Sequence, residues 1–242
     1  MPDEAAPVQS ILRAFQLLEA LAAAGGTASV TELRDASKLP VSTIHRLLRT
    51  LVAAGYVRQE ANRTYALGMK VARLGEATGH LVARWATPHL QRVVDRLDES
   101  ANLAKLDGQH VVYVAQVPGR HSMRMFTEVG RRAGVHTTAV GKAMLAQLPE
   151  RRARTLVEHG PRSPESLRAE LDRVRGDGYA IDDEEEEPGV KCVAVALPPV
   201  DLAVPMAVSI SGPVTRMTDD LVRSAVPVLA AAASTLAAEF ST

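Results

Sequence analysis

The segment that most constrains the fold is residues 40–55, whose pattern predicts one short helix with two chemically different faces. Apolar residues recur at the spacing i, i+3, i+4 and i+7 and form a single stripe: Ile44, Leu47, Leu48 and Leu51. Pro40 is suited to the start of such a helix, and Gly55 to the left-handed residue that ends it. The stripe has to pack against other elements, so we expect the helix to be part of a small globular domain.

The opposite face of this helix is polar and basic. At about 100° per residue it gathers Ser42, His45, Arg46 and Arg49. No Asp or Glu occurs between residues 39 and 59. A helix that packs with one side and offers hydroxyl and guanidinium donors on the other suits the DNA major groove. Alternatives are that Arg46 pairs with Glu32 or Asp35, and that the helix serves a protein interaction instead.

The flanking pattern completes a predicted winged helix-turn-helix. A helix over residues 8–24 comes first, with an expected buried stripe of Ile11, Phe15, Leu18 and Leu21. A second helix over residues 30–37 has a capping-box pattern. Two strands, residues 56–59 and 64–67, form a hairpin with a flexible tip. The residues predicted to contact DNA, through the helix and this wing, are Ser42, Thr43, His45, Arg46, Arg49, Arg58, Asn62 and Arg63.

The rest of the chain is predicted to be a linker helix followed by an α+β domain. Residues 68–84 read as a helix, and Pro88 is expected to start a separate one. Six strands follow in two groups, and Asp107-Gly108 marks a hairpin turn in the first group. The expected strands are 102–106, 111–117, 123–127, 179–181, 190–197 and 203–210. We therefore expect an antiparallel sheet backed by helices, with domains at 1–67, 68–87 and 88–242.

Composition excludes several classes of protein. The formal net charge of the 242 residues is zero, so any nucleic-acid binding has to come from a local patch. One cysteine allows no intramolecular disulfide, and no metal-ligand spacing links the histidines. The N-terminus does not look like a signal peptide, and the longest apolar run, residues 226–238, is too short to span a bilayer. We expect a cytoplasmic protein without membrane, metal or cofactor.

The order and spacing of several short motifs resemble the IclR family of bacterial transcriptional regulators. In the first domain the matching segments lie at residues 42–48, 55–57 and 65–68. In the second they are HTTAVGKA at 136–143, GYAID at 178–182, PGVKCVA at 188–194 and VSISG at 208–212. The resemblance implies a winged helix that binds double-stranded operator DNA and a GAF-like domain that binds a small effector. It also implies a homodimer or a dimer of dimers, and an effector that alters operator binding.

Matching these motifs residue by residue implies an effector pocket. Its polar members are Asp182, Cys192, Ser209 and Ser211, its helix start is Ala139 and Val140, and its apolar walls are Met125, Ala133 and Val190. A helix start with free N–H groups and two serines at i, i+2 on one strand suit a small carboxylate. Asp182 in turn favours a hydroxyl on that ligand or a bound water, because it would repel a second carboxylate. Ala139 and Val140 are bulkier than the residues typical of glyoxylate-binding members, so glyoxylate and pyruvate are not carried over.

Cys192 and the acidic run also have simpler structural interpretations. A lone cysteine on an apolar strand is usually a small core residue, and the acidic run at residues 182–187 is usually a solvated loop. An enzyme with Cys192 as its nucleophile, perhaps served by His136, is an alternative, as is a sensor that acts through protein partners. We interpret the chain as a ligand-responsive repressor that binds a palindromic operator, and not as an enzyme.

Overall fold

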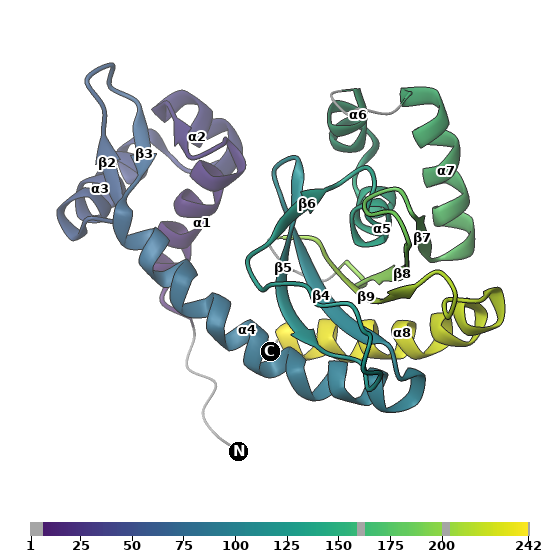
Figure 1. The fold of residues 1–242 in the computed structure, drawn as a ribbon. Coiled ribbons are helices and arrows are strands. Elements are labelled where there is room, and N and C mark those ends of the chain that lie inside the picture. The colour runs from purple at the N-terminus through teal and green to yellow at the C-terminus, as the bar shows by residue number, and fades with distance from the viewer. Residues whose placement is uncertain (1–6, 159–162, 200–203, 242) are drawn as a thin grey trace. The chain divides into compact units, whose positions relative to one another are not determined.

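The computed structural model describes residues 7–158, 163–199 and 204–241, which form two compact units (Figure 1). The first unit extends to Gly79 and the second begins at His80. Each unit has its own hydrophobic core. We describe each unit by itself.

The first unit is a winged helix, as predicted. Its helices are α1 (Gln9–Ala23), α2 (Val30–Ser37) and α3 (Val41–Ala54), and its strands are β1 (Thr27–Ala28), β2 (Val57–Gln59) and β3 (Tyr65–Leu67). The strands form an antiparallel sheet in the order β1-β3-β2. The four apolar residues of the α3 stripe are buried together with Leu17, Leu21 and Leu33.

Local chemistry sets the ends of these helices. Ser29 and Glu32 form the expected capping box at the start of α2. Gly55 follows α3 with φ +79°, the left-handed conformation that glycine adopts without strain. In the turn between α2 and α3, the Ser37 hydroxyl donates to Leu33 O (2.6 Å) and accepts from Leu39 N (3.3 Å). These bonds define where α3 begins and therefore which of its side chains face outward.

The predicted buried face of α1 is right for Leu18 and Leu21 and wrong for Ile11 and Phe15. Leu17 and Leu21 are fully buried, whereas Ile11 and Phe15 are 53% and 56% exposed. The helix carries apolar side chains on both sides, so its periodicity fits two different stripes. Only packing against α2 and α3 selects the stripe that is buried.

The second unit is built on one antiparallel sheet of six strands. The strands are β4 (Ser100–Asp107), β5 (His110–Val117), β6 (Arg132–Gly134), β7 (Ala180–Asp183), β8 (Val190–Ala196) and β9 (Met206–Pro213). Their order across the sheet is β6-β5-β4-β9-β8-β7, which makes β6 and β7 its two edges. The α+β class and the hairpin turn at residues 107–108 are confirmed. The predicted strand at 123–127 is wrong, because that segment is a loop and the edge strand is β6.

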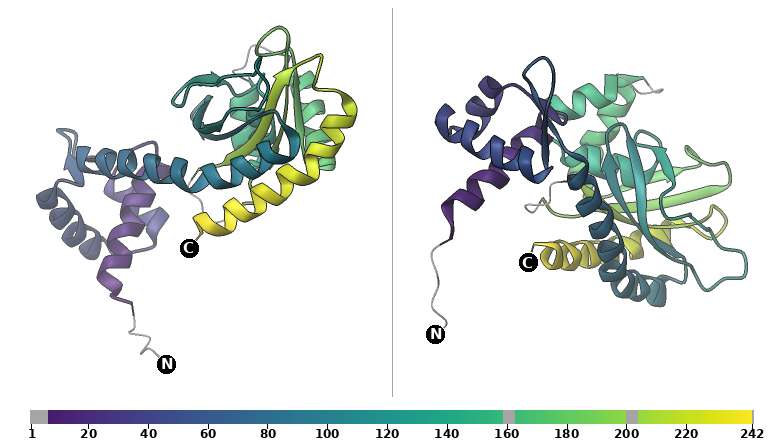
Figure 2. Two further views of the ribbon diagram at one scale, coloured as in Figure 1. Left: turned by 60° about the horizontal axis from the view of Figure 1, so that its bottom comes forward. Right: turned by 90° about the vertical axis from the view of Figure 1, so that its left-hand side faces the viewer.

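Helices cover both faces of this sheet (Figures 1 and 2). One face packs against the C-terminal part of α4 (Met69–Leu97) and against α8 (Asp219–Phe240). The other face packs against α5 (Ala139–Gln147), followed by α6 (Glu150–Glu158) and α7 (Pro164–Asp177). Alternate residues of each central strand therefore enter two different cores.

Pro88 does not start a new helix, contrary to our expectation, but lies inside α4. The missing N–H and the ring clash of an interior proline cost about 3 kcal/mol. Ala86, Leu90 and Val93, on both sides of the proline, are almost fully buried against the sheet. Continuous packing across this position offsets the lost backbone bond.

The length of α8 corrects our expectation for the apolar run at residues 226–238. Among the described residues, α8 is the one helix that is long and apolar enough to cross a membrane. Its buried residues, which include Val222, Leu229 and Leu236, form part of the core on the sheet. One side of α8 thus packs on the sheet, and about 33% of its apolar window is buried.

Candidate functional site

The exposed face of α3 is the predicted polar face. Ser42, His45, Arg46 and Arg49 are exposed, and Thr43 is half-buried. Among the described residues, the guanidinium groups of Arg46 and Arg49 make no hydrogen bond or ion pair. The alternative that Arg46 pairs with Glu32 or Asp35 is wrong, because Asp35 pairs with Arg34 at 2.8 Å and Glu32 caps α2. Two arginines on one face thus keep all their donors available to a partner.

The wing gives its predicted residues different roles. The Asn62 side chain accepts hydrogen bonds from the Thr64 backbone N–H (3.1 Å) and hydroxyl (2.6 Å), so it holds the turn itself. The Arg58 guanidinium is bound to Glu60. Arg63 lies at the exposed tip with φ +66°, and its guanidinium makes no hydrogen bond or ion pair among the described residues. The wing therefore presents Arg63 most freely.

In the second unit one pocket lies between the start of α5 and the sheet. All nine residues predicted from the resemblance line it: Met125, Ala133, Ala139, Val140, Asp182, Val190, Cys192, Ser209 and Ser211. Seven further lining residues were not predicted: Asn102, Tyr113, Thr127, Arg131, Thr138, Glu186 and Glu187. That these residues bind a ligand stays a prediction.

The sheet register explains why the polar members meet. Asp182 pairs with Cys192, and Cys192 with Ser211, so the three lie in one row on the same face. Ser209 lies two residues from Ser211 and opposite Asn102. The Asn102 amide donates to Ser211 Oγ at 3.2 Å. The Ser209 side chain is almost fully buried and makes no hydrogen bond among the described residues. It points a free donor into the pocket.

The start of α5 adds backbone donors. The Thr138 hydroxyl accepts from Gly141 N (3.1 Å) and donates to Gly134 O (2.6 Å), which caps the helix. The N–H groups of Ala139 and Val140, in the first turn, have no acceptor among the described residues. The pocket thus combines N–H and O–H donors of the kind that bind an anion.

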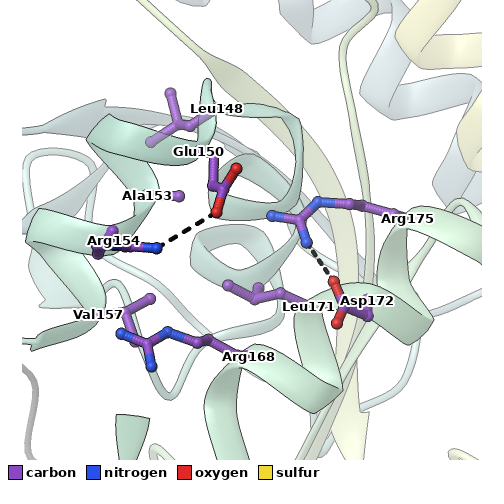
Figure 3. A pocket seen from close by; sticks show the side chains of 9 residues that line it. All are labelled: Leu148, Glu150, Ala153, Arg154, Val157, Arg168, Leu171, Asp172 and Arg175. Atoms are coloured by element: carbon purple, nitrogen blue, oxygen red, sulfur yellow. Dashed lines mark hydrogen bonds and ion pairs between the residues drawn. The ribbon is translucent and has the colours of Figure 1, made fainter. Parts of the chain in front are cut away.

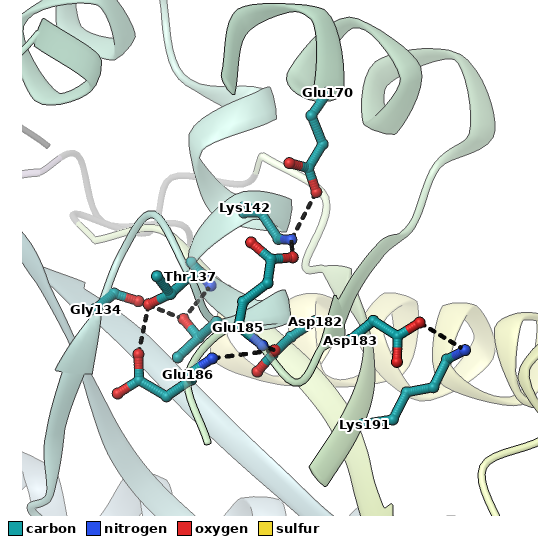
Figure 4. A network of polar contacts seen from close by, with 11 residues as sticks. Gly134, Thr137, Lys142, Glu170, Asp182, Asp183, Glu185, Glu186 and Lys191 are labelled. Atoms are coloured by element: carbon teal, nitrogen blue, oxygen red, sulfur yellow. Dashed lines mark hydrogen bonds and ion pairs between the residues drawn. The ribbon is translucent and has the colours of Figure 1, made fainter. Parts of the chain in front are cut away.

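Four of the six residues of the acidic run, 182–187, are exposed, as expected of a solvated loop, but the run is also bonded to the rest of its unit. Residues 184–187, called the acidic strap from here on, cross from β7 toward the opposite edge of the sheet (Figure 4). Asp182 accepts from the backbone N–H groups of Glu185 (2.9 Å) and Glu186 (3.3 Å). The fully buried Lys142 binds Glu185 and, at 2.6 Å, Glu170. Thr137 donates to Glu186 at 2.5 Å. Two residues of the strap, Glu186 and Glu187, line the pocket.

Burial raises the pKa of three groups that line the pocket: Tyr113, Asp182 and Cys192. It raises the pKa of Asp182 to about 6, although two backbone hydrogen bonds and Lys142 act in the opposite direction. Burial, with neighbouring carboxylates, also raises the pKa of the Cys192 thiol well above its usual range. The thiol has no hydrogen bond to a base among the described residues, and the His136 ring is bonded to Leu156 O at 2.8 Å. This environment opposes the thiolate that a nucleophile requires.

A second hollow lies between α6 and α7 (Figure 3). Its cavity volume is much larger, about 480 Å³ against about 30 Å³ for the pocket at α5. Its three arginines are already paired with acidic side chains: Arg154 with Glu150, Arg168 with Glu158 and Arg175 with Asp172. It offers fewer free donors than the pocket at α5.

Two protein-family models match this chain, one in the first unit and one mainly in the second. Residues 10–61 match the IclR helix-turn-helix domain, and residues 76–238 match the Bacterial transcriptional regulator IclR C-terminal domain. The chain is 35% identical over 230 residues to the Transcriptional repressor IclR of Escherichia coli, covering 89% of this chain and 84% of that protein.

Solved structures of IclR-family proteins share the fold of this chain. An IclR-family regulator from Rhodococcus sp. aligns over 99% of this chain and 96% of its own, with a TM-score of 0.70 and 28% identity. An IclR homolog from Microbacterium hydrocarbonoxydans, complexed with 4-hydroxybenzoate, covers 96% of this chain and 98% of its own; it shares the fold at a TM-score of 0.58 and 22% identity. The chain belongs to the IclR family of bacterial transcriptional regulators.

Proposed function

We propose that this chain is a ligand-responsive repressor in the cytoplasm that binds a palindromic operator through α3 and the wing. A small organic acid in the pocket at α5 modulates that binding. The observation that carries the DNA-binding part is the exposed face of α3, with Arg46 and Arg49 unpaired among the described residues. Guanidinium donors on such a face suit guanine edges and phosphates.

A dimer is the proposed binding unit. The outer face of α1 exposes four apolar side chains at helical spacing: Val8, Ile11, Leu12 and Phe15. An apolar stripe of this kind on a DNA-binding unit favours self-association. A twofold dimer presents two α3 helices to two half-sites, which is the symmetry of an inverted repeat. A dimer of dimers extends the same arrangement.

The pocket chemistry supports an organic acid as the effector. The Ser209 hydroxyl and the N–H groups of Ala139 and Val140 are donors for a carboxylate. Asp182, buried beside Cys192 and Ser211, suits a hydroxyl on the same ligand. An aromatic hydroxy acid such as 4-hydroxybenzoate is therefore a reasonable probe.

The test is a gel-shift titration with the DNA upstream of the chain's own gene, comparing wild type, Arg49→Ala and Arg168→Ala. If Arg49 reads a base, Arg49→Ala weakens specific binding by about 1–3 kcal/mol. Arg168 lies on α7 in the other unit, so its loss controls for the change in net charge. A wild-type protein that fails to shift this DNA at low salt would favour the alternative of a sensor acting through protein partners.

A further inference from the structure

Arg131 enters the pocket from the loop that precedes β6. The backbone at this position is fixed, because Arg131 N donates to Glu128 O (3.0 Å) and its carbonyl accepts from Tyr113 N (3.2 Å). The next residue, Arg132, does not line the pocket, and its guanidinium binds Asp107 at 2.6 Å. Neighbouring arginines thus have different environments, and only Arg131 belongs to the pocket.

The Arg131 guanidinium is weakly engaged. The structure places it 3.8 Å from a Glu187 oxygen, which is too long for a hydrogen bond. It makes no side-chain hydrogen bond among the described residues. Both side chains are partly exposed, at 41% and 48%, and exposed ion pairs contribute little to stability. Glu187 is therefore a partner that another carboxylate can replace.

The charged side chains that line the pocket are mainly acidic, so a carboxylate ligand needs a basic partner there. Three acidic side chains line the cavity, namely Asp182, Glu186 and Glu187, and Arg131 is the one basic side chain among its described lining residues. Lys142 lies close by but is already bound to Glu170 and Glu185. A carboxylate ligand that entered without a cationic partner would be repelled.

The acidic strap is held unevenly along its length. Its first part is anchored by the buried Lys142–Glu185 contact, and its middle by the bond from Thr137 to Glu186. Its outer end, Glu187, reaches Arg131 only through the 3.8 Å contact. Replacing Glu187 at Arg131 would free this end and leave the anchored part in place.

We propose that Arg131 is a ligand-binding residue whose guanidinium exchanges Glu187 for the carboxylate of the effector. The planar guanidinium matches a carboxylate in a bidentate pair, which is stronger and more specific than the long contact to Glu187. The exchange releases the outer end of the acidic strap from Arg131. Binding of the acid is thereby coupled to a change in the strap. This inference rests on the proposed function of the pocket as a site for a small organic acid.

The experiment is calorimetric titration of the full-length protein with two acid–amide pairs: 4-hydroxybenzoate with 4-hydroxybenzamide, and lactate with lactamide. Arg131→Gln is expected to weaken binding of the acid at least tenfold and to leave binding of the amide unchanged. Glu187→Gln is expected to strengthen acid binding severalfold, because it removes the competing carboxylate. Arg131→Lys keeps the positive charge but cannot form the bidentate pair. Its affinity for the acid should lie between those of wild type and Arg131→Gln. Arg132→Gln is the control and should bind as wild type does.

The outcomes separate this inference from the proposed function. Acid binding that is equal in wild type, Arg131→Gln and Glu187→Gln overturns the role of Arg131 but keeps the pocket as an acid site. If Arg131→Gln weakens acid and amide equally, the side chain shapes the pocket and the exchange is overturned. If neither acid binds wild type or Glu187→Gln, the proposal of an organic-acid effector fails, and this inference fails with it.

Discussion

At Asp182, burial and hydrogen bonding act in opposite directions on one carboxyl group. Two backbone N–H donors from the acidic strap favour the carboxylate, and so does nearby Lys142. Removal from water favours the neutral acid, and this effect is larger, so the pKa rises to about 6. The residue that ties the strap to the pocket is therefore a group that changes charge just below neutral pH.

The stability of the folded protein should depend on this group. Because the folded pKa is above the unfolded value of about 3.8, the contribution of Asp182 is present in full below pH 3.8 and is lost as the pH rises through 6. Relative to Asp182→Asn, wild type should gain about 1.4 kcal/mol in free energy of unfolding between pH 7.5 and pH 5. Urea unfolding at both pH values measures this difference, with Asp183→Asn as the control for a lost charge. Parallel pH profiles for wild type and Asp182→Asn would contradict the assignment.

Some contacts between single residues could be predicted from the sequence, and others could not. Ser209 and Ser211 could be predicted to share a face, because side chains alternate along a strand. Arg131 and Glu187 could not be predicted to meet, since they lie 56 positions apart and their approach depends on the path of the strap. The acidic run has the composition of a solvated loop, and only the buried Lys142 shows that it is held down.

At the scale of elements, local signals were reliable and tertiary ones were not. The capping box of α2, the glycine after α3 and the hairpin at residues 107–108 depend on neighbouring residues and were predicted. The continuity of α4 through Pro88 depends on packing against the sheet. The strand β6 has three residues, too few for a visible alternation, and it exists because it pairs with β5.

The start of α5 illustrates an element set by close packing. A Cβ atom built on Gly141 would lie 2.3 Å from Val135 O, so this helix approaches the preceding backbone more closely than any other residue allows. Gly141→Ala should lower the free energy of unfolding by at least about 1–3 kcal/mol. The matched change Gly176→Ala, in α7 and with open space around it, should raise stability by up to about 1 kcal/mol. Chemical denaturation of both variants tests the prediction, and effects of the same sign would refute it.

At the scale of the whole molecule, the proposed function requires that two copies of the chain act together. One winged helix reads one half-site, and an inverted repeat is read with high affinity only when two are joined. The chain exposes an apolar stripe on α1 that its own core leaves uncovered, although the helix has a fully buried stripe of its own. In the proposed dimer, the buried side of α1 packs inside the unit and its exposed apolar side contacts the partner.

This division of α1 predicts how dimerisation and DNA binding are linked. Phe15→Glu places a charge in the exposed stripe without touching Leu17 or Leu21, so each unit should stay folded while self-association weakens. Sedimentation should then show a smaller species, and affinity for the inverted repeat should fall toward that for a single half-site. Val204→Glu, at an exposed apolar position of the other unit, should leave both properties unchanged. If Phe15→Glu keeps the wild-type assembly, α1 is not the dimer surface; if it dissociates but still binds the full repeat with wild-type affinity, operator recognition does not require the dimer.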